Sequence, residues 1–238
     1  MFSLDGKAAV VIGGGAGLGL AIARSYLEAG ARVVIGDLRS DGADIAREIG
    51  AHFVHVDVAD ESSVAQAMGR VEESIGKIDI LVNNVGVWPT ARIDAIDEAT
   101  ARKILEVNFL GVTWGIKHGS RIMNDGGSII NTTALVTYRP LEGLGVYSAA
   151  KAAILSLTRT AAIELGHRDI TVNSVSPTSI TGTEGNQEMG QDEINLISNL
   201  TPLQRLAEVD DFIGIFNLLA ADAGGFINAV DIPIDGGL

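Results

Sequence analysis

The chain has 238 residues and no cysteine, which excludes disulfide bonds and thiolate chemistry and agrees with a reducing, cytoplasmic location. Its hydrophobic content of 47% suffices for a full core, and its length suits an α/β fold built as one domain, residues 1–238. A formal net charge of −13 repels nucleic acid and anionic lipid, and the longest uncharged N-terminal run, residues 8–23, is too short and glycine-rich to cross a bilayer. We therefore expect neither nucleic acid nor a membrane as a partner.

Short β-rich apolar runs alternate with longer helical patterns along the chain. Strands are predicted at residues 8–13, 32–37, 52–57, 78–83, 127–132, 171–176 and 230–234. Helices are predicted at residues 18–28, 41–49, 61–75, 98–124, 146–166 and 208–221. The predicted strands are continuously apolar, as strands covered on both faces should be. The alternation predicts an α/β fold: a doubly wound, mostly parallel sheet of about seven strands with helices on both faces.

Residues 177–202 carry no regular pattern and follow the carboxyl end of the predicted strand 171–176. Open α/β sheets bind ligands at this edge, and long loops inside a compact domain are usually lids or binding loops. We therefore expect residues 178–201 to form a substrate-binding lid within the domain.

A glycine-rich turn, residues 13–19, stands between the first predicted strand and the first predicted helix. Glycine lets the backbone approach a pyrophosphate closely, and the helix N-terminus offers free N–H groups and a partial positive charge. Asp37 ends the second predicted strand, where its carboxylate can accept hydrogen bonds from both ribose hydroxyls of an adenosine. The pattern predicts a dinucleotide site; a turn that serves only packing, with a solvated Asp37, is the alternative.

The cofactor expected from this arrangement is NAD, with NADP less favoured. Asp37 repels a 2′-phosphate, and neither residue next to it is basic. Arg39 is close enough in the sequence to bind such a phosphate, which keeps NADP as the alternative.

Tyr147 and Lys151 lie four residues apart in a predicted helix, a spacing that places a phenol and an ammonium side by side on one helix face. A free phenol with a pKa near 10 is a poor proton shuttle at neutral pH, but a neighbouring cation lowers that pKa. The pair predicts an acid/base device, with a chance pairing as the alternative.

These motifs, in this order, resemble the short-chain dehydrogenase/reductase family over essentially the whole chain. Further matches are Asp57-Val58, Asn83-Asn84-Val85-Gly86, Asn108, residues 173–177 and Asp235-Gly236-Gly237. The resemblance implies a Rossmann fold, a nicotinamide dinucleotide cofactor, and a small secondary alcohol or ketone as substrate. The cofactor-binding residues that it implies are Gly13, Gly15, Gly17, Leu18, Gly19, Asp37, Leu38, Asp57, Val58, Asn84, Gly86, Val107, Tyr147, Lys151, Pro177 and Ile180.

The resemblance also implies a mechanism and an assembly. Tyr147 would exchange a proton with the substrate oxygen, Lys151 would hold the nicotinamide ribose and lower the pKa of the phenol, and the main chain at Asn108 would bind a water of a proton relay. A buried Asn that braces a helix is the other interpretation of Asn108. In relatives, the helices equivalent to residues 98–124 and 146–166 build a subunit interface, so the resemblance implies a homotetramer; packing within one subunit is the alternative.

One member of the family's catalytic set is missing. The family places a serine thirteen residues before the tyrosine, where its hydroxyl hydrogen-bonds the substrate oxygen, and here that position is Ala134. Thr133 would substitute if the strand end bulges by one residue, which adds it to the catalytic candidates. Alternatively the enzyme works without the hydroxyl, or with one from Thr137 or Tyr138. In the third account Ala134, natural or engineered, blunts the chemistry, and the chain is an NAD-binding protein with little turnover and a regulatory or scaffold role.

Three smaller departures from the family pattern affect the cofactor turn, the carboxamide contact and the C-terminus. Ile12 replaces the threonine that usually precedes the glycine turn. The usual carboxamide-binding threonine falls on Gly182, between Thr181 and Thr183. Residues 228–231 read Asn-Ala-Val-Asp in place of Thr-Gly-Gln-Val, which could alter subunit contacts.

No metal site is expected, because His52 and His55 lie three apart on a predicted strand and so face opposite sides. Residues after strand ends and in the predicted lid are the candidates for the pocket wall. They are Trp88, Leu135, Tyr138, Arg139, Glu142, Met189 and Leu196, a mixture that favours a medium-sized, partly apolar substrate.

Overall fold

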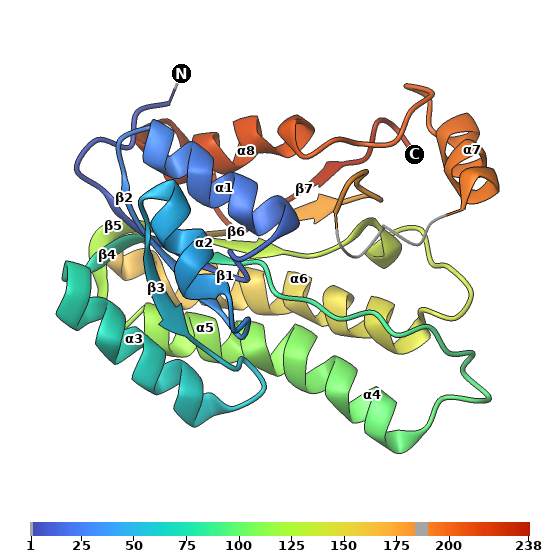
Figure 1. Ribbon diagram of the computed structural model, residues 1–238, viewed down its shortest axis with the longest axis horizontal. Helices are drawn as coiled ribbons and strands as arrows, with labels where there is room; N and C mark the ends of the chain where they lie inside the picture. Colours follow the sequence, from blue (N-terminus) through green and yellow to red (C-terminus); the bar gives the residue numbers. More distant parts are fainter. Residues whose placement is uncertain (1, 184–189) are drawn as a thin grey trace.

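The computed structural model describes residues 2–183 and 190–238, and its centre is one parallel sheet (Figure 1). The strands follow the order β3-β2-β1-β4-β5-β6-β7, and all six neighbouring pairs are parallel. The sequence-based prediction of a doubly wound sheet of about seven strands is confirmed. The strands are β1 (Ala8–Ile12), β2 (Arg32–Asp37), β3 (His52–His55), β4 (Ile78–Asn83), β5 (Met123–Thr132), β6 (Thr171–Pro177) and β7 (Asp231–Ile234).

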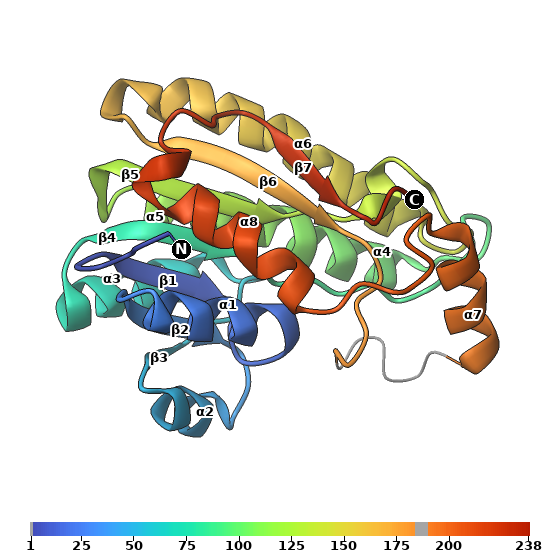
Figure 2. The same ribbon diagram turned by 90° about the horizontal axis from the view of Figure 1, so that it is seen from above.

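Helices cover both faces of the sheet. In Figure 2, α1 and α8 lie in front of the strands while α4 and α5 lie behind them. The helices are α1 (Gly17–Glu28), α2 (Gly42–Ile49), α3 (Glu61–Ile75), α4 (Glu98–Leu105), α5 (Gly111–Gly119), α6 (Gly145–Leu165), α7 (Gln191–Leu200) and α8 (Asp210–Ala220).

Two apolar clusters, one on each face, explain why the strands read as continuous apolar runs. Along β1, the side chains of Val10 and Ile12 join the cluster under α3, α5 and α6, whereas Ala9 and Val11 join the cluster under α1 and α8. Successive strand residues point to opposite faces, so in a strand covered on both faces neither set of side chains faces solvent.

The helix predicted over residues 98–124 is wrong in two respects. A π-helical turn, Glu106–Leu110, separates α4 from α5, and residues 123–124 belong to β5. The side chains of Ile122 and Met123 are buried, and Met123 pairs with Ile78 of β4, so sheet pairing overrides the local helical pattern.

The irregular stretch predicted over residues 177–202 is also wrong in part, because it contains α7. The signal was present in the sequence. Asp192 and Glu193 occupy the first turn, where acidic side chains favour a helix N-terminus. The remaining bounds of predicted elements, apart from the start of β5, agree with the structure within two residues.

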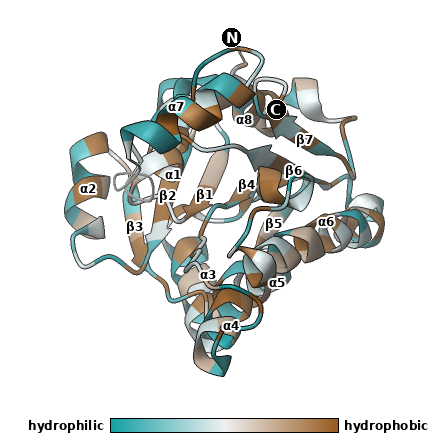
Figure 3. Cartoon of the chain, turned by 90° about the vertical axis from the view of Figure 1, so that its right-hand side faces the viewer, coloured by the Kyte–Doolittle hydropathy of each residue, from teal (hydrophilic) through white to brown (hydrophobic). Residues whose placement is uncertain are grey.

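The carboxyl ends of the strands meet at one edge of the sheet. Figure 3 looks onto this edge, with α7 on one side and α4 on the other. The strand order reverses between β1 and β4, and such a switch point leaves the crevice in which open α/β sheets bind ligands. None of the helices in the described part of the chain is long and apolar enough to cross a membrane.

Candidate active site

The glycine turn joins the end of β1 to the start of α1. Gly13 has a φ of +78°, and a Cβ at Gly19 would lie only 1.9 Å from the carbonyl oxygen of Gly13. Ala16, which precedes the helix, makes no side-chain capping hydrogen bond to it. The first turn of α1 is therefore not capped by a side chain, and its N–H groups and positive helix end suit a pyrophosphate.

Asp37 lies beside this turn at the end of β2. Its Oδ2 accepts a hydrogen bond from the backbone N–H of Gly15 at 2.9 Å, and its Oδ1 accepts one from the N–H of Arg39 at 3.1 Å. The guanidinium of Arg39 forms a two-pronged ion pair with the carboxylate of Asp41, both contacts at 2.9 Å. A carboxylate in contact with the glycine turn is where an adenosine ribose would need one.

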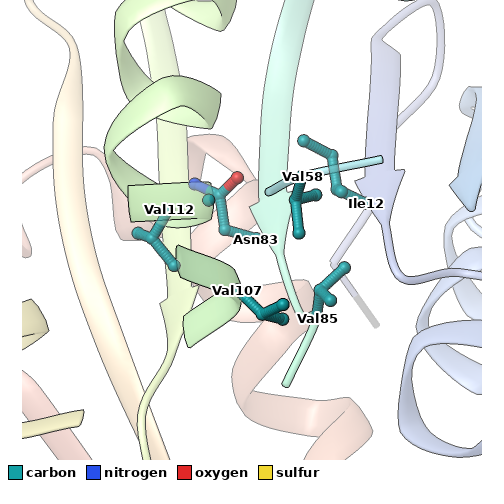
Figure 4. Close-up of a pocket in the computed structure, with 7 residues that line it drawn as sticks. Ile12, Val58, Asn83, Val85, Val107 and Val112 are labelled. Carbon is teal, nitrogen blue, oxygen red and sulfur yellow. The ribbon is translucent and has the colours of Figure 1, made fainter. Parts of the chain in front are cut away.

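Hydrophobic side chains form the floor beneath the switch point (Figure 4). Val58, Val85 and Val107 converge there with Asn83 around a cavity of about 10 Å³. A cavity of this volume holds at most about one water, so it is part of the floor and not a ligand site. Asn83 Oδ1, which lines it, is buried with no hydrogen-bond partner among the described residues.

Asn84 connects the carboxyl ends of β1, β4 and β5 by hydrogen bonds. Its bond to Gly13 helps to hold the glycine turn, for which the family usually has a threonine at position 12. Its Nδ2 donates to the carbonyl oxygen of Gly13 at 3.2 Å, and its Oδ1 accepts from the hydroxyl of Thr132 at 3.0 Å. Its backbone N–H donates to the carbonyl of Ile12 at 2.9 Å. The glycine turn is thus held by β4 and β5, with the side chain of Ile12 packed in the core.

Asn108 lies in the π-helical turn and is fully buried. Its Nδ2 donates to the carbonyls of Val87 at 2.7 Å and Ile104 at 2.9 Å, while its Oδ1 accepts from the N–H of Val87 at 3.1 Å. The side chain therefore braces the loop after β4 against the helix.

Tyr147 and Lys151 both lie on α6, and Lys151 is only 2% exposed. The Lys151 Nζ donates to the carbonyl oxygen of Thr132 at 2.8 Å and lies 5.9 Å from the centroid of the Tyr147 ring. A Cβ at Gly86 would lie 3.5 Å from this Nζ and 3.0 Å from Asn108 Oδ1. Five residues from four segments of the sequence thus come together, and Gly86 leaves space there.

Burial dominates the protonation of this pair. It raises the pKa of Tyr147 to about 12 and lowers the pKa of Lys151 to about 8. In the chain on its own, loss of water around the phenolate outweighs any attraction to Lys151, and the lowering of the phenol pKa by this cation stays a prediction. At neutral pH the phenol carries its proton and the ammonium is mostly charged.

The contacts of Thr133 argue against it as the substitute for the missing serine. The register of β5 on β6 is regular through Thr132, with no bulge up to that residue, and the Thr133 side chain is buried. Its hydroxyl lies 2.9 Å from the carbonyl of Val175, 2.6 Å from Ser176 Oγ and 3.0 Å from Asp231 Oδ1. The Tyr138 hydroxyl also donates to Asp231, at 2.9 Å.

Thr137 has the remaining hydroxyl of this segment. Its N–H donates to the carbonyl of Ala134 at 3.1 Å, so the two residues share one turn. The Thr137 hydroxyl oxygen is buried and has no hydrogen-bond partner among the described residues, a property shared by the Ser148 hydroxyl. Buried polar groups are rarely left in this state unless a water or ligand completes them.

The segment after β6 reaches back to the glycine turn. A Cβ at Gly17 would lie 3.4 Å from Thr183 Cγ2, whereas the hydroxyl of Thr181 donates to the carbonyl of Ala207 at 3.3 Å. Thr183 is thus the threonine beside the cofactor turn. Ile180 is buried and bridges to Ala207.

Trp88 lies next to Tyr147, and several other residues expected in the pocket wall are exposed. The Trp88 ring, 43% exposed, has its centroid 6.4 Å from that of Tyr147 at an interplanar angle of 57°. Leu141 and Leu196 are also exposed, and the guanidinium of Arg92 pairs with the carboxylate of Glu142. Met189, expected in the pocket wall, and residues 184–188 of the expected lid lie outside the described residues. In the described ranges, no group of three or more His, Cys, Asp or Glu residues could hold a metal ion.

Sequence reasoning missed two parts of this arrangement. The carbonyl of Thr132, which binds Lys151, is a backbone group that no residue pattern marks. The second is the set of hydroxyl partners around Asp231, which a carboxylate in place of an apolar strand residue signals.

Comparisons with known proteins agree with this fold. A family model described as Enoyl-(Acyl carrier protein) reductase matches residues 13–238. Cis-4-hydroxycyclohexanecarboxylate dehydrogenase of Sinomonas cyclohexanicum is 35% identical over 97% of this chain and 96% of its own. NADP-dependent (R)-specific alcohol dehydrogenase of Lentilactobacillus kefiri is 33% identical over 98% of this chain and 97% of its own.

A solved structure of a short-chain dehydrogenase/reductase from Serratia marcescens superposes with a TM-score of 0.92 at 32% identity, covering 98% of both chains. The chain therefore belongs to the short-chain dehydrogenase/reductase family, Rossmann-fold oxidoreductases that typically use NAD or NADP.

Replacing Gly19 by alanine is expected to weaken NADH binding at least about tenfold, because the new Cβ would lie 1.9 Å from the Gly13 carbonyl oxygen and force the turn open. Fluorescence titration with NADH measures the change. Gly69→Ala is the matched control, since Gly69 lies in α3 where a Cβ meets nothing within 4 Å. Equal affinities of the two variants would contradict the role given to the turn.

Proposed function

We propose that the protein is an NAD(H)-dependent oxidoreductase that interconverts a secondary alcohol and a ketone, with Tyr147 as general acid and base. The observation that carries this proposal is the buried Lys151 ammonium, whose Nζ lies 5.9 Å from the Tyr147 ring beside the space left by Gly86. The glycine turn and Asp37 would hold the pyrophosphate and the adenosine ribose. Asp57, Val58 and Val107 would flank the adenine.

When bound, the nicotinamide supplies or accepts the hydride. The chain's own residues handle the proton: Tyr147 gives it to the carbonyl oxygen in reduction and takes it back in oxidation. Lys151 would hold the nicotinamide ribose and stabilise the phenolate by its charge. Asn108 would keep the loop after β4 in place through its side chain and bind a relay water through its main chain.

NAD is favoured over NADP by the charges next to the adenosine ribose site. Asp37 contacts the Gly15 N–H, so a 2′-phosphate would meet its carboxylate. The guanidinium of Arg39, the cation nearest in sequence, is paired with Asp41. The relatives do not decide the matter, since the Lentilactobacillus kefiri enzyme is named as NADP-dependent.

Thr137 is our choice for the donor that replaces the missing serine. The Thr133 hydroxyl has its partners on β6 and at Asp231, and the Tyr138 hydroxyl donates to Asp231. This leaves Thr137 as the residue of this segment whose buried hydroxyl has no partner among the described residues. A substrate oxygen would complete its hydrogen bonding.

The aromatic and aliphatic mouth of the site favours a partly apolar substrate of medium size. The ring of Trp88 stands beside the Tyr147 ring, and Leu196 of α7 is exposed. We propose that residues 178–201 form a lid within a single domain and that the subunits assemble as a homotetramer. A relative named for a cyclic hydroxy acid, cis-4-hydroxycyclohexanecarboxylate, supports a ring-bearing alcohol.

Ala134 supports a second candidate, a cofactor-binding protein with little turnover. Loss of one oxyanion-type donor typically reduces a rate on the order of 10²–10³-fold without abolishing cofactor binding. Turnover over a panel of cyclic and acyclic secondary alcohols with NAD and with NADP, beside a titration with NADH, separates the two. Tight NADH binding without turnover of any alcohol or ketone would favour the second candidate.

Tyr147→Phe is expected to remove turnover while leaving NADH affinity nearly unchanged, because it deletes the proton donor and keeps the buried ring. Steady-state rates and NADH titration measure the two effects. Tyr138→Phe, which removes an exposed phenol bonded to Asp231, is the comparison variant and should keep about a third or more of the wild-type turnover. An unchanged rate for Tyr147→Phe would overturn the assignment of the acid.

The pH profile of ketone reduction should fall as pH rises through about 8, because Lys151 is cationic below its pKa of about 8 and neutral above it. The profile of kcat/KM reports the free enzyme, to which this pKa applies. Lys151→Arg keeps the charge at all these pH values, so its residual activity should lack this descending limb. A limb at the same pH in both proteins would show that another group titrates.

Thr137→Val is expected to lower kcat/KM roughly 10²–10³-fold, the usual effect of losing one such donor. Ala134→Ser in the Thr137→Val background should restore most of the rate, since it returns a hydroxyl to the family position. Ser148→Ala is the control, because it removes the other buried, unpartnered hydroxyl. A loss in Ser148→Ala with none in Thr137→Val would reassign the donor.

A further inference from the structure

Asp231, the first residue of β7, lies at the centre of a cluster of hydroxyl groups. Its Oδ1 accepts from Ser174 Oγ at 2.5 Å and Thr133 Oγ1 at 3.0 Å. Its Oδ2 accepts from Ser176 Oγ at 2.7 Å and Tyr138 OH at 2.9 Å. An ionised carboxylate offers about four lone-pair sites, so these donors use its accepting capacity.

The partners of Asp231 divide into two kinds. Ser174 and Ser176 alternate along β6 and so point to one face, and Ser174 is in register with Asp231. These two bonds join β7 to β6. The other two reach Thr133, directly after β5, and Tyr138, after the 3₁₀ turn Leu135–Thr137, and so hold both ends of the segment 133–138.

The segment held in this way is the one that faces the substrate in the proposed reaction. It contains Ala134, at the position of the missing serine, and Thr137, and its 3₁₀ turn packs against α6, the helix of Tyr147. The chain departs from the family pattern both at Ala134 and at Asp231, and the hydroxyls of Thr133 and Tyr138 connect the two places.

We propose that Asp231 is a positioning residue: through Thr133 and Tyr138 it fixes the segment 133–138, and with it the substrate oxygen, relative to Tyr147. The proposal rests on the proposed function. Misplacement of a substrate by about 1 Å can slow a reaction on the order of 100-fold, so such a tether affects kcat without touching the reacting atoms.

The test compares two sets of hydrogen bonds to Asp231. The loop bonds come from Thr133 and Tyr138 and form the tether of the segment 133–138, and the strand bonds come from Ser174 and Ser176 of β6. Tyr138→Phe removes a loop bond and leaves the strand bonds, whereas Ser174→Ala removes a strand bond and leaves the loop bonds. Asp231→Asn preserves the shape of the side chain and weakens both sets, and it covers the case in which Asp231→Val does not fold. For each variant kcat, KM, NADH affinity and melting temperature are measured.

We expect Asp231→Asn to lower kcat at least about tenfold. A full misplacement of about 1 Å would cost roughly 100-fold, and the variant weakens the bonds without removing the side chain. Tyr138→Phe should lower kcat by about threefold, because the bond from Thr133 remains. NADH affinity should stay within about twofold in both, and Ser174→Ala should keep the wild-type kcat. If Ser174→Ala and Tyr138→Phe lose the same fraction of kcat, and the loss follows the fall in melting temperature, the cluster has only a structural role and the proposal is contradicted. Wild-type kcat in Asp231→Asn would overturn the proposal.

Hydrogen exchange gives a readout that does not need turnover. The N–H groups of Thr137, Tyr138 and Arg139 donate within the segment, and their exchange should accelerate at least about threefold in Asp231→Asn and Tyr138→Phe but not in Ser174→Ala. If the wild-type protein turns over no alcohol, the proposed function fails while the exchange result still reports on the tether. Unchanged exchange in Asp231→Asn would refute the tether itself.

Discussion

The site depends on holding an ammonium group almost entirely out of water. Removing a cation from water is costly unless it is hydrogen-bonded, and burial accordingly lowers the pKa of Lys151 to about 8. The carbonyl of Thr132 is the fixed acceptor that keeps the cation in place. The hydroxyl of the same residue donates to Asn84, and Asn84 in turn donates to the Gly13 carbonyl. A single chain of hydrogen bonds thus connects Lys151 on α6 with the turn after β1, so the proposed acid/base pair and the proposed dinucleotide site have one common support.

The hydroxyl groups that follow β5 differ in their hydrogen-bond partners: two have partners within the protein, and one has none among the described residues. Asp231 attracts the hydroxyls of Thr133 and Tyr138, because an ionised acceptor forms stronger hydrogen bonds than a neutral one. This withdraws two of the three hydroxyls that the sequence offers as substitutes for a serine at position 134. The Thr137 hydroxyl has no partner in the described part of the chain, and that contrast makes it the candidate for contact with the substrate.

The sequence predicted best those features that depend on local pattern or on motif spacing. Continuous apolar runs predicted the strands, because each strand is covered on both faces, and the spacing of Tyr147 and Lys151 predicted their meeting on one helix. The errors arose where tertiary contacts override local preference. Because Met123 pairs with Ile78 of β4, β5 begins inside the stretch whose sequence pattern predicted a helix. Whether Thr133 faces the site depended on the presence of a bulge, which a sequence alone does not reveal.

The direction of the pKa shifts determines what the cofactor must contribute to the proposed reaction. A phenol with a pKa of about 12 is ionised in only about one molecule in 10⁵ at pH 7, so the chain alone is prepared to donate a proton and not to accept one. Reduction of a ketone uses the group in this state. Alcohol oxidation requires the phenolate, and Lys151 at 5.9 Å from the ring does not by itself offset the loss of hydration. An oxidised nicotinamide held beside Tyr147 would bring a positive charge that the reduced form lacks, and this charge would favour the phenolate that alcohol oxidation needs.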